Sequence, residues 1–345
     1  MHFLVKRGSK HKIKNRFESQ FYDFENEPEE LEAFSGIKTR FIEVFPKTIV
    51  NKVKSPEISF EYSLNPYQGC EHGCAYCYAR PTHEYWGYSA GIDFEQTILV
   101  KKNAPQLLRK TLSNPKWKPS PIILSGNTDC YQPAERKFKL TRELLQVCLE
   151  YQHPVAIITK NHLILRDLDI IKQLSENQLV LVNISITTLQ EELRRNLEPR
   201  TSSVINKLKA ISELSKHNIP VNVMIAPIIP GLNEHEIPQI MKTTSESGAI
   251  NAHYTIVRLN ETVEPVFLKW LEEKYPLKYQ KITRKLQAAY NGNFSGFATN
   301  SNDLEIASIH RMFELYKRKF FGNCSQKFKL NCRNFTPTPG QTKLF

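Results

Sequence analysis

Three of the seven cysteines of the chain lie within eight consecutive residues, in the stretch CEHGCAYC that spans residues 70–77. Thiolates are soft ligands, suited to zinc or to iron–sulfur clusters. A structural zinc site needs a fourth Cys or His nearby, whereas the next cysteine, Cys130, lies more than fifty residues further along. A 4Fe-4S cluster held by only three cysteines leaves one iron open to a ligand from outside the protein. The spacing therefore favours a catalytic cluster over structural zinc or a buried set of thiols.

This stretch resembles the signature of the radical S-adenosylmethionine (radical SAM) enzymes, with Cys70, Cys74 and Cys77 and the aromatic Tyr76 before the last cysteine. In that superfamily the open iron chelates the amino and carboxylate groups of the methionine moiety. An electron from the cluster then cleaves the sulfonium to a 5′-deoxyadenosyl radical. The resemblance implies two cofactors, a 4Fe-4S cluster and S-adenosylmethionine, with the three cysteines as metal ligands and Tyr76 at the cofactor site. It also implies a reductant protein such as flavodoxin or ferredoxin as partner.

The composition of the 345-residue chain, 40% hydrophobic and 24% charged, is typical of a globular protein. The sequence contains no run of eighteen apolar residues and no signal peptide at its start. We therefore expect a cytoplasmic protein without a membrane partner, in which an odd number of cysteines argues against a disulfide framework. The formal net charge is +12, which suggests nucleic acid as a partner. A solvated basic surface without a partner would have the same composition.

The N-terminal segment is divided by charge. Residues 1–17 carry six cations and no acid, and residues 18–32 carry seven acids. This pattern indicates a mobile, charged N-terminal extension over residues 1–44. The basic arm could contact nucleic-acid phosphates or fold back on its acidic neighbour.

Short apolar runs alternate with amphipathic stretches through the centre of the chain, which indicates βα units and a parallel sheet. The six predicted strands agree with the fold that the resemblance implies, an α/β partial (β/α)6 barrel of the radical SAM type with N- and C-terminal extensions. The core is assigned to residues 45–260, and a C-terminal helical extension that covers the barrel to residues 261–345. The predicted strands span residues 60–64, 121–125, 155–159, 179–187, 221–228 and 254–259.

The reacting groups of βα barrels lie at the carboxyl ends of the strands. After the second strand comes the turn Gly126-Asn127-Thr128-Asp129. Radical SAM enzymes usually have a Gly-rich turn here that holds the methionine ammonium, so the resemblance assigns cofactor binding to Gly126, Asn127 and Thr128. The turn departs from the common Gly-Gly-Glu form, and a plain capping turn is the alternative.

The fourth strand ends with Asn183, Ser185 and Thr187 on one face. Short polar side chains inside a barrel are costly unless they meet a polar ligand, and the resemblance places the nucleoside here, which makes Ser185 and Thr187 cofactor-binding candidates. Arg200 could pair with the methionine carboxylate or with Glu198.

The turn after the fifth strand contains Gly231, which fits part of a superfamily element that packs on the adenine. A plain helix start is the alternative. Residues 79–86, directly after the cysteines, are a polar and aromatic mixture that could line a substrate pocket or pack into the core.

Further motifs, in residues 65–80, 126–133 and 159–161, resemble uncharacterised bacterial radical SAM proteins grouped with spore photoproduct lyase and loosely called DNA-repair photolyases. The resemblance implies hydrogen abstraction from a substrate, with nucleic acid as the leading candidate. Alternatives are the same core acting on a protein or small molecule, and a non-catalytic nucleic-acid-binding iron–sulfur protein. Spore photoproduct lyases use a cysteine near the second strand end as hydrogen-atom donor, which makes Cys130 the catalytic candidate. A structural thiol is the alternative, and Cys324 and Cys332 have no assigned role.

Overall fold

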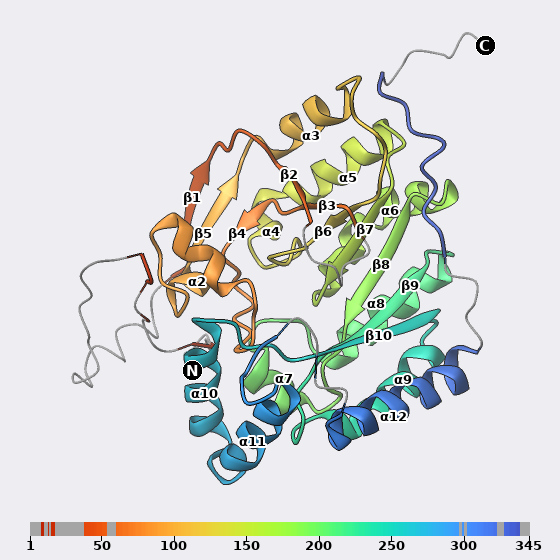
Figure 1. Cartoon of the computed structure of the whole chain (residues 1–345). Coiled ribbons are helices and arrows are strands. Elements are labelled where there is room, and N and C mark those ends of the chain that lie inside the picture. Colours follow the sequence, from red (N-terminus) through yellow and green to blue (C-terminus); the bar gives the residue numbers. More distant parts are fainter. Residues whose placement is uncertain are drawn as a thin grey trace, which may run out of the picture.

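The computed structural model describes residues 8, 9, 13, 15–17, 38–53, 60–296, 299, 302–322 and 328–338. Its centre is a seven-stranded sheet in the order β10-β9-β8-β7-β6-β3-β2 (Figure 1). Only β2 (Val50–Lys52) is antiparallel to its neighbour. The six parallel strands follow chain order across the sheet, which confirms the predicted βα architecture: β3 (Tyr62–Leu64), β6 (Ile122–Leu124), β7 (Val155–Thr159), β8 (Val180–Ser185), β9 (Val221–Ile228) and β10 (Asn251–Ile256).

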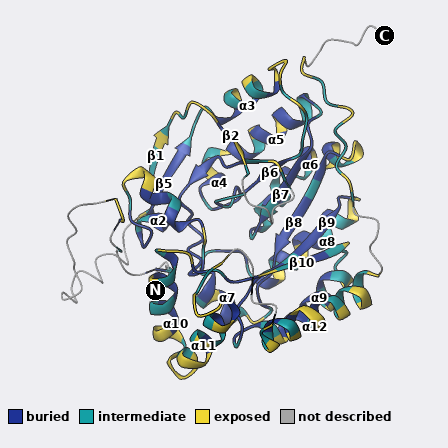
Figure 2. Cartoon of the chain, viewed as in Figure 1, coloured by how far each residue is buried: buried dark blue, intermediate teal, exposed yellow. Residues whose placement is uncertain are grey.

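Helices follow the parallel strands and pack their apolar faces on the sheet, so that the central strands β6 to β9 are buried almost throughout (Figure 2). In α5, for example, Leu144, Leu145 and Cys148 are buried at helical spacing. The last predicted strand is shifted, because β10 begins three residues before residue 254. The remaining helices of the core are α3 (Ala104–Leu112), α4 (Glu135–Phe138), α5 (Leu140–Glu150), α6 (Leu168–Glu176), α7 (Glu191–Leu197), α8 (Val204–Lys216) and α9 (Ile237–Glu246).

A second, three-stranded sheet lies beside the first, next to the short helix α2 (Asp93–Gln96) (Figure 1). In it β5 (Thr97–Lys101) pairs in parallel with β1 (Arg40–Val44) and antiparallel with β4 (Tyr67–Gln68). The sequence analysis did not predict this sheet. It also corrects the boundary of the N-terminal extension, because residues 40–44 are a paired strand. Most of residues 1–37 lie outside the described residues.

The C-terminal region is helical, as predicted. It contains α10 (Val263–Lys274), α11 (Tyr279–Ala289) and α12 (Leu304–Phe321). Helix α12 packs against α9 and β10, and so covers the sheet at its β10 edge (Figure 1). Residues 331 and 336 donate backbone hydrogen bonds to the carbonyls of Gln178 and Tyr151, which precede β8 and β7. No described helix is long and apolar enough to span a bilayer.

Candidate active site

The cysteine loop, residues 69–77, runs from β4 to the 3-10 helix η1 (Arg80–Trp86). It is bound to distant segments through its backbone: Cys70 N–H donates to Phe94 O at 2.8 Å, and Ala75 N–H donates to Leu197 O at 3.1 Å. Gly69 and Gly73 have positive φ angles of 82° and 66°, which glycine adopts without strain. Cys70 and Cys74 are buried and Cys77 is partly buried.

A buried ion pair fixes the outer side of this loop. The Arg80 guanidinium donates from Nη2 to the Cys74 carbonyl at 2.9 Å and to Glu95 Oε1 at 2.6 Å. Its Nη1 donates to the carbonyls of Ala90 and Gly91. Arg80 and Glu95 are both completely buried, and a long cation is rarely buried without such a set of partners. The pair therefore anchors the backbone of the cysteine loop at Cys74.

The donor set fits an iron–sulfur cluster. Burial raises the pKa of all three thiols, and the mutual repulsion of Cys70, Cys74 and Cys77 raises the pKa of Cys70 further. Such thiolates need the positive charge of a metal centre. Among the described residues no three Cys, His, Asp or Glu side chains converge on one ion, but a cubane binds its cysteines through different irons and needs no such convergence.

Two predicted cofactor residues, Tyr76 and Thr187, converge on the buried carboxylate of Glu198. The Tyr76 hydroxyl donates to Glu198 Oε1, and Thr187 Oγ1 donates to the same oxygen at 2.5 Å. The other oxygen lies 2.9 Å from Lys207 Nζ, which is also buried. Burial alone would raise the pKa of Glu198, but Lys207 and Lys160 lower it to about 2. The hydroxyls of Tyr76 and Thr187 therefore stabilise the negative charge of Glu198, next to the cysteine loop.

The predicted turn after β6 is also committed to protein contacts. Asn127 Nδ2 donates to Thr82 Oγ1 at 3.1 Å and to Gln68 Oε1 at 3.3 Å. The Thr128 hydroxyl donates to the Tyr67 carbonyl at 2.7 Å. The Gly126 carbonyl accepts from the Tyr78 hydroxyl at 2.9 Å. These contacts join the turn to β4 and to the segment after the cysteines, and they use the side-chain donors of Asn127 and Thr128.

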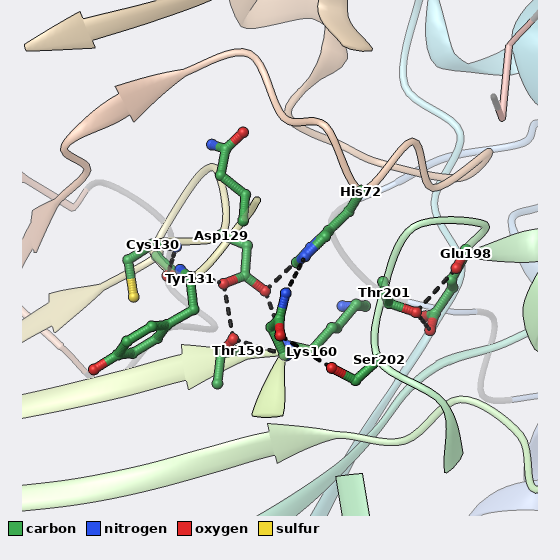
Figure 3. Close-up of polar contacts among 12 residues, drawn as sticks. His72, Asp129, Cys130, Tyr131, Thr159, Lys160, Glu198, Thr201 and Ser202 are labelled. Atoms are coloured by element: carbon green, nitrogen blue, oxygen red, sulfur yellow. Dashed lines mark hydrogen bonds and ion pairs between the residues drawn. The ribbon is translucent and has the colours of Figure 1, made fainter. Parts of the chain in front are cut away.

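Asp129 continues this network toward the cysteine loop (Figure 3). It accepts from Thr159 Oγ1 and from the backbone N–H of Lys160, both at 2.8 Å. Its Oδ2 lies 3.4 Å from Nδ1 of the buried His72, and His72 Nε2 lies 3.3 Å from Asn161 Nδ2. The network thus links the ends of β6 and β7 to the residue between Cys70 and Cys74.

Two polar side chains at the carboxyl ends of β7 and β8, those of Lys160 and Ser185, make no polar contact with another described residue. Lys160 directly follows β7, and its ammonium lies 5.9 Å from the centroid of the Tyr76 ring. Burial alone would lower the pKa of Lys160, but Glu198 and other negative groups raise it above its ordinary value. In the described part of the chain, neither the Lys160 ammonium nor the hydroxyl of the buried Ser185 has a hydrogen-bond or ion-pair partner. A cation and a hydroxyl could therefore face a polar ligand.

Arg200 pairs with Glu71, not with Glu198. Arg200 Nη2 lies 3.0 Å from Glu71 Oε1, whereas Glu198 is occupied by Lys207. The predicted structural alternative for Arg200 therefore names the wrong carboxylate. Nη1 of Arg200 and Oε2 of Glu71 are buried without a partner among the described residues. One free donor thus remains on Arg200 beside the cysteine loop.

The last two predicted site residues lie in different surroundings. Gly231 has a φ of 90°, and a Cβ there would lie 3.2 Å from Ile282 and Lys285 of α11, so this glycine is in contact with the C-terminal region. Cys130 is completely buried in the main hydrophobic core. Its sulfur is directed away from the Asp129–His72 pair (Figure 3). Its hydrogen-donor role stays a prediction, and its burial agrees with the structural alternative.

Lys160, Arg80 and Glu95 were not predicted individually as site residues, although Arg80 and Lys160 lie in the motifs of residues 79–86 and 159–161. Lys160 had a usable signal, because it directly follows the third predicted strand, at the same edge as the turns that were analysed. The Arg80–Glu95 pair had none, since a buried ion pair across fifteen residues is visible only in three dimensions.

Comparison with known proteins agrees with this geometry. A family model described as the radical SAM superfamily matches residues 64–244, more than half of the chain. An uncharacterised protein of Mycobacterium tuberculosis is 32% identical over 258 residues, which cover 73% of this chain and 75% of that protein. An uncharacterised protein of Methanocaldococcus jannaschii is 30% identical over 248 residues, which cover 72% and 88%. A solved structure of a spore photoproduct lyase variant with bound AdoMet and dinucleoside spore photoproduct has a TM-score of 0.62 at 16% identity, and the match covers 88% of this chain and 86% of that chain.

The fold and the cysteine loop are those of a radical SAM protein, and the chain belongs to the radical SAM superfamily. It is an enzyme of that superfamily, with a 4Fe-4S cluster and S-adenosylmethionine as cofactors. The predicted partial barrel is confirmed. The identity to the lyase is low, so this likeness concerns the fold.

Proposed function

We propose that this radical SAM enzyme abstracts hydrogen from a nucleic-acid substrate, in a reaction similar to that of a DNA-repair lyase. When bound, the cluster and S-adenosylmethionine supply the 5′-deoxyadenosyl radical for this chemistry. The cluster is held by Cys70, Cys74 and Cys77, whose backbone is fixed by Arg80 and Glu95. A reductant protein such as flavodoxin or ferredoxin delivers the electron.

Lys160, Ser185 and Arg200 bind S-adenosylmethionine in this proposal. The first two support it because their polar groups have no protein partner in the described chain, and Arg200 because its Nη1 is free. A carboxylate would satisfy Lys160 or the free Arg200 donor by a charge-assisted hydrogen bond. Tyr76 and Thr187 do not contact the ligand in this proposal. Their hydroxyls hydrogen-bond to Glu198 and so hold the cysteine loop in place. The turn after β6 is fixed by the contacts of Gly126, Asn127 and Thr128. Gly231, which contacts α11, lies in the turn that we assign to the adenine of S-adenosylmethionine.

The observation that carries the substrate class is the exposure of aromatic side chains directly after the cysteines. Tyr78 is 55% exposed, Tyr85 is 70% exposed and Trp86 is 43% exposed. Large exposed rings grouped in one short segment indicate a binding surface. Nucleobases stack on such rings, with about 1–3 kcal/mol per base, and the net charge of +12 favours a polyanion. A neighbour in fold, the spore photoproduct lyase variant with bound dinucleoside spore photoproduct, supports the same class.

A binding experiment tests the substrate class. Fluorescence anisotropy with labelled single-stranded DNA, double-stranded DNA and RNA should show salt-dependent binding. Replacing one stacking ring, in Tyr85→Ala or Trp86→Ala, should weaken binding by roughly five- to one-hundredfold, because each stacked base contributes about 1–3 kcal/mol. Deoxyadenosine formation without substrate should stay unchanged in both variants.

The matched control is Phe45→Ala, which removes another exposed ring, 68% exposed, from the loop after β1. Nucleic-acid affinity should be unchanged in this variant. If the wild-type chain binds none of the three nucleic acids, the substrate is a protein or small molecule. If it binds nucleic acid but forms no deoxyadenosine after anaerobic reconstitution, the catalytic part of the proposal fails.

A further inference from the structure

The described residues of the N-terminal segment lie against the cysteine loop. The backbone N–H of Gly8 donates to Glu95 Oε2 at 2.9 Å, and that of Ser9 donates to Glu95 Oε1 at 2.7 Å. Glu95 also pairs with Arg80, which holds the Cys74 carbonyl. One buried carboxylate thus connects the start of the chain to the loop that carries the cluster ligands.

The contact between the two backbones leaves no room for side chains. A Cβ on Gly8 would lie 1.6 Å from the carbonyl oxygen of Gly73. A Cβ on Gly73 would lie 2.7 Å from Glu95 Oε2 and 3.2 Å from Gly8 N. Gly73 is the residue that precedes Cys74 in the cysteine loop. The approach therefore depends on glycine at both positions.

A second anchor fixes the same segment a few residues further on. Asn15 is 1% exposed, and its Nδ2 donates to the carbonyls of Glu84 and Tyr88 at 3.2 and 3.3 Å. Arg16 Nε lies 3.3 Å from the Glu84 carboxylate, and Arg16 also pairs with Glu261, which follows β10. The segment is therefore held at both ends of its described part. It is not a separate tail there.

We infer that the N-terminal segment is a positioning element of the cluster site, in which Gly8 and Ser9 complete the hydrogen bonding of Glu95 and cover the outer side of the cysteine loop. Glu95 in turn holds Arg80 and the Cys74 carbonyl in place. This inference rests on the proposed role of Cys70, Cys74 and Cys77 as cluster ligands. It assigns the basic segment a structural task at the cofactor, in addition to any contact with phosphates.

The test is the rate at which a chelator removes the cluster from the full-length, anaerobically reconstituted enzyme. Gly8→Ala adds one methyl group that cannot fit against Gly73. It should accelerate the loss of cluster absorbance by roughly ten- to one-hundredfold, because a hydrogen bond to a charged group is broken. The circular dichroism spectrum of the cluster-free chain should stay that of the wild type, which a general folding defect would not allow. Leu277→Ala, at a completely exposed position, is the control and should match wild type in both measurements.

Asn15→Ala tests the second anchor without adding a clash and should also accelerate cluster loss, by a smaller factor. If Gly8→Ala fails to fold, the rate of cluster loss from Asn15→Ala tests the inference in its place. Wild-type rates of cluster loss in the folded variants would overturn the inference. If the wild-type chain assembles no cluster at all, the proposed function fails instead, so the two failures are distinguishable.

Discussion

Two neighbouring regions at the carboxyl edge of the sheet have similar residue types and different roles. The turn after β6 carries Asn127, Thr128 and Asp129, and each of these side chains is hydrogen-bonded within the protein. The ends of β7 and β8 carry Lys160 and Ser185, whose polar groups have no partner in the described chain. An unused donor can pair with a ligand without breaking a contact within the protein. The difference favours the ends of β7 and β8 as the proposed ligand site, and residue type alone would not have separated the two regions.

The largest effect is expected from removing a cluster ligand, because without the cluster neither region can bind S-adenosylmethionine productively. Cys74→Ala should abolish both the cluster absorbance and the formation of deoxyadenosine, because three thiolates are needed and no other cysteine lies in the described site. Cys148→Ala, in the apolar face of α5, should leave both intact. Reconstitution under anaerobic conditions with iron and sulfide, followed by product analysis, measures this. A variant without Cys70, Cys74 and Cys77 that still assembles the cluster would refute the assignment.

The next largest effect concerns the buried charge behind the cysteine loop. Glu198→Gln leaves Lys207 buried without its counter-charge, which should reduce the free energy of unfolding by about 3–5 kcal/mol. Glu198→Gln combined with Lys207→Met should recover much of this loss. Chemical denaturation of the cluster-free chain measures both. Equal stability of wild type and Glu198→Gln would mean that the pair does not stabilise the fold.

The same carboxylate gives a pH dependence with a defined sign. Its pKa in the folded chain is about 2, below the ordinary value of 4.5. The stabilisation is therefore fully present above pH about 5 and is lost as the pH falls toward 2, with a total on the order of 3 kcal/mol. Glu198→Gln should flatten the decrease in stability over this range.

The two regions can be separated directly by their effect on S-adenosylmethionine. Lys160→Met removes an uncommitted cation and should weaken cosubstrate affinity by roughly ten- to one-hundredfold, since charge-assisted hydrogen bonds contribute about 1.5–3 kcal/mol. Thr128→Val removes a committed hydroxyl and should leave affinity within a factor of about two. Equilibrium binding to the reconstituted enzyme distinguishes these outcomes. The reverse result would return the ligand to the turn after β6.

The sequence was sufficient for the parallel strands of the larger sheet because most of them are apolar runs, of which β7, with residues VAIIT, is an example. The smaller sheet was missed because β4 has only two residues and β1 lies next to a charged segment. At the site, the cysteines were identified by their spacing and by the family resemblance. The commitments of Asn127, Thr187 and Tyr76 could not be predicted, because their partners lie on other strands and turns. Sequence periodicity places a residue on a face, but it does not show which distant group occupies its hydrogen bonds.

The smallest predicted effect separates the cations of the N-terminal segment. Arg16 is paired with Glu84 and Glu261, so its guanidinium is already neutralised by two carboxylates and is not expected to bind a phosphate. Lys10 and Lys12 lie outside the described residues, and their contact with phosphates stays a prediction. Arg16→Gln should therefore change the slope of log affinity against log salt by less than about 0.3, whereas Lys10→Gln should flatten it by about 0.7–0.9, the value of one released counterion. Titrations with labelled single-stranded DNA at several salt concentrations measure both slopes. Equal flattening by the two variants would mean that Arg16 leaves its carboxylates to bind phosphate, and the segment would then release its anchor on η1 when nucleic acid binds.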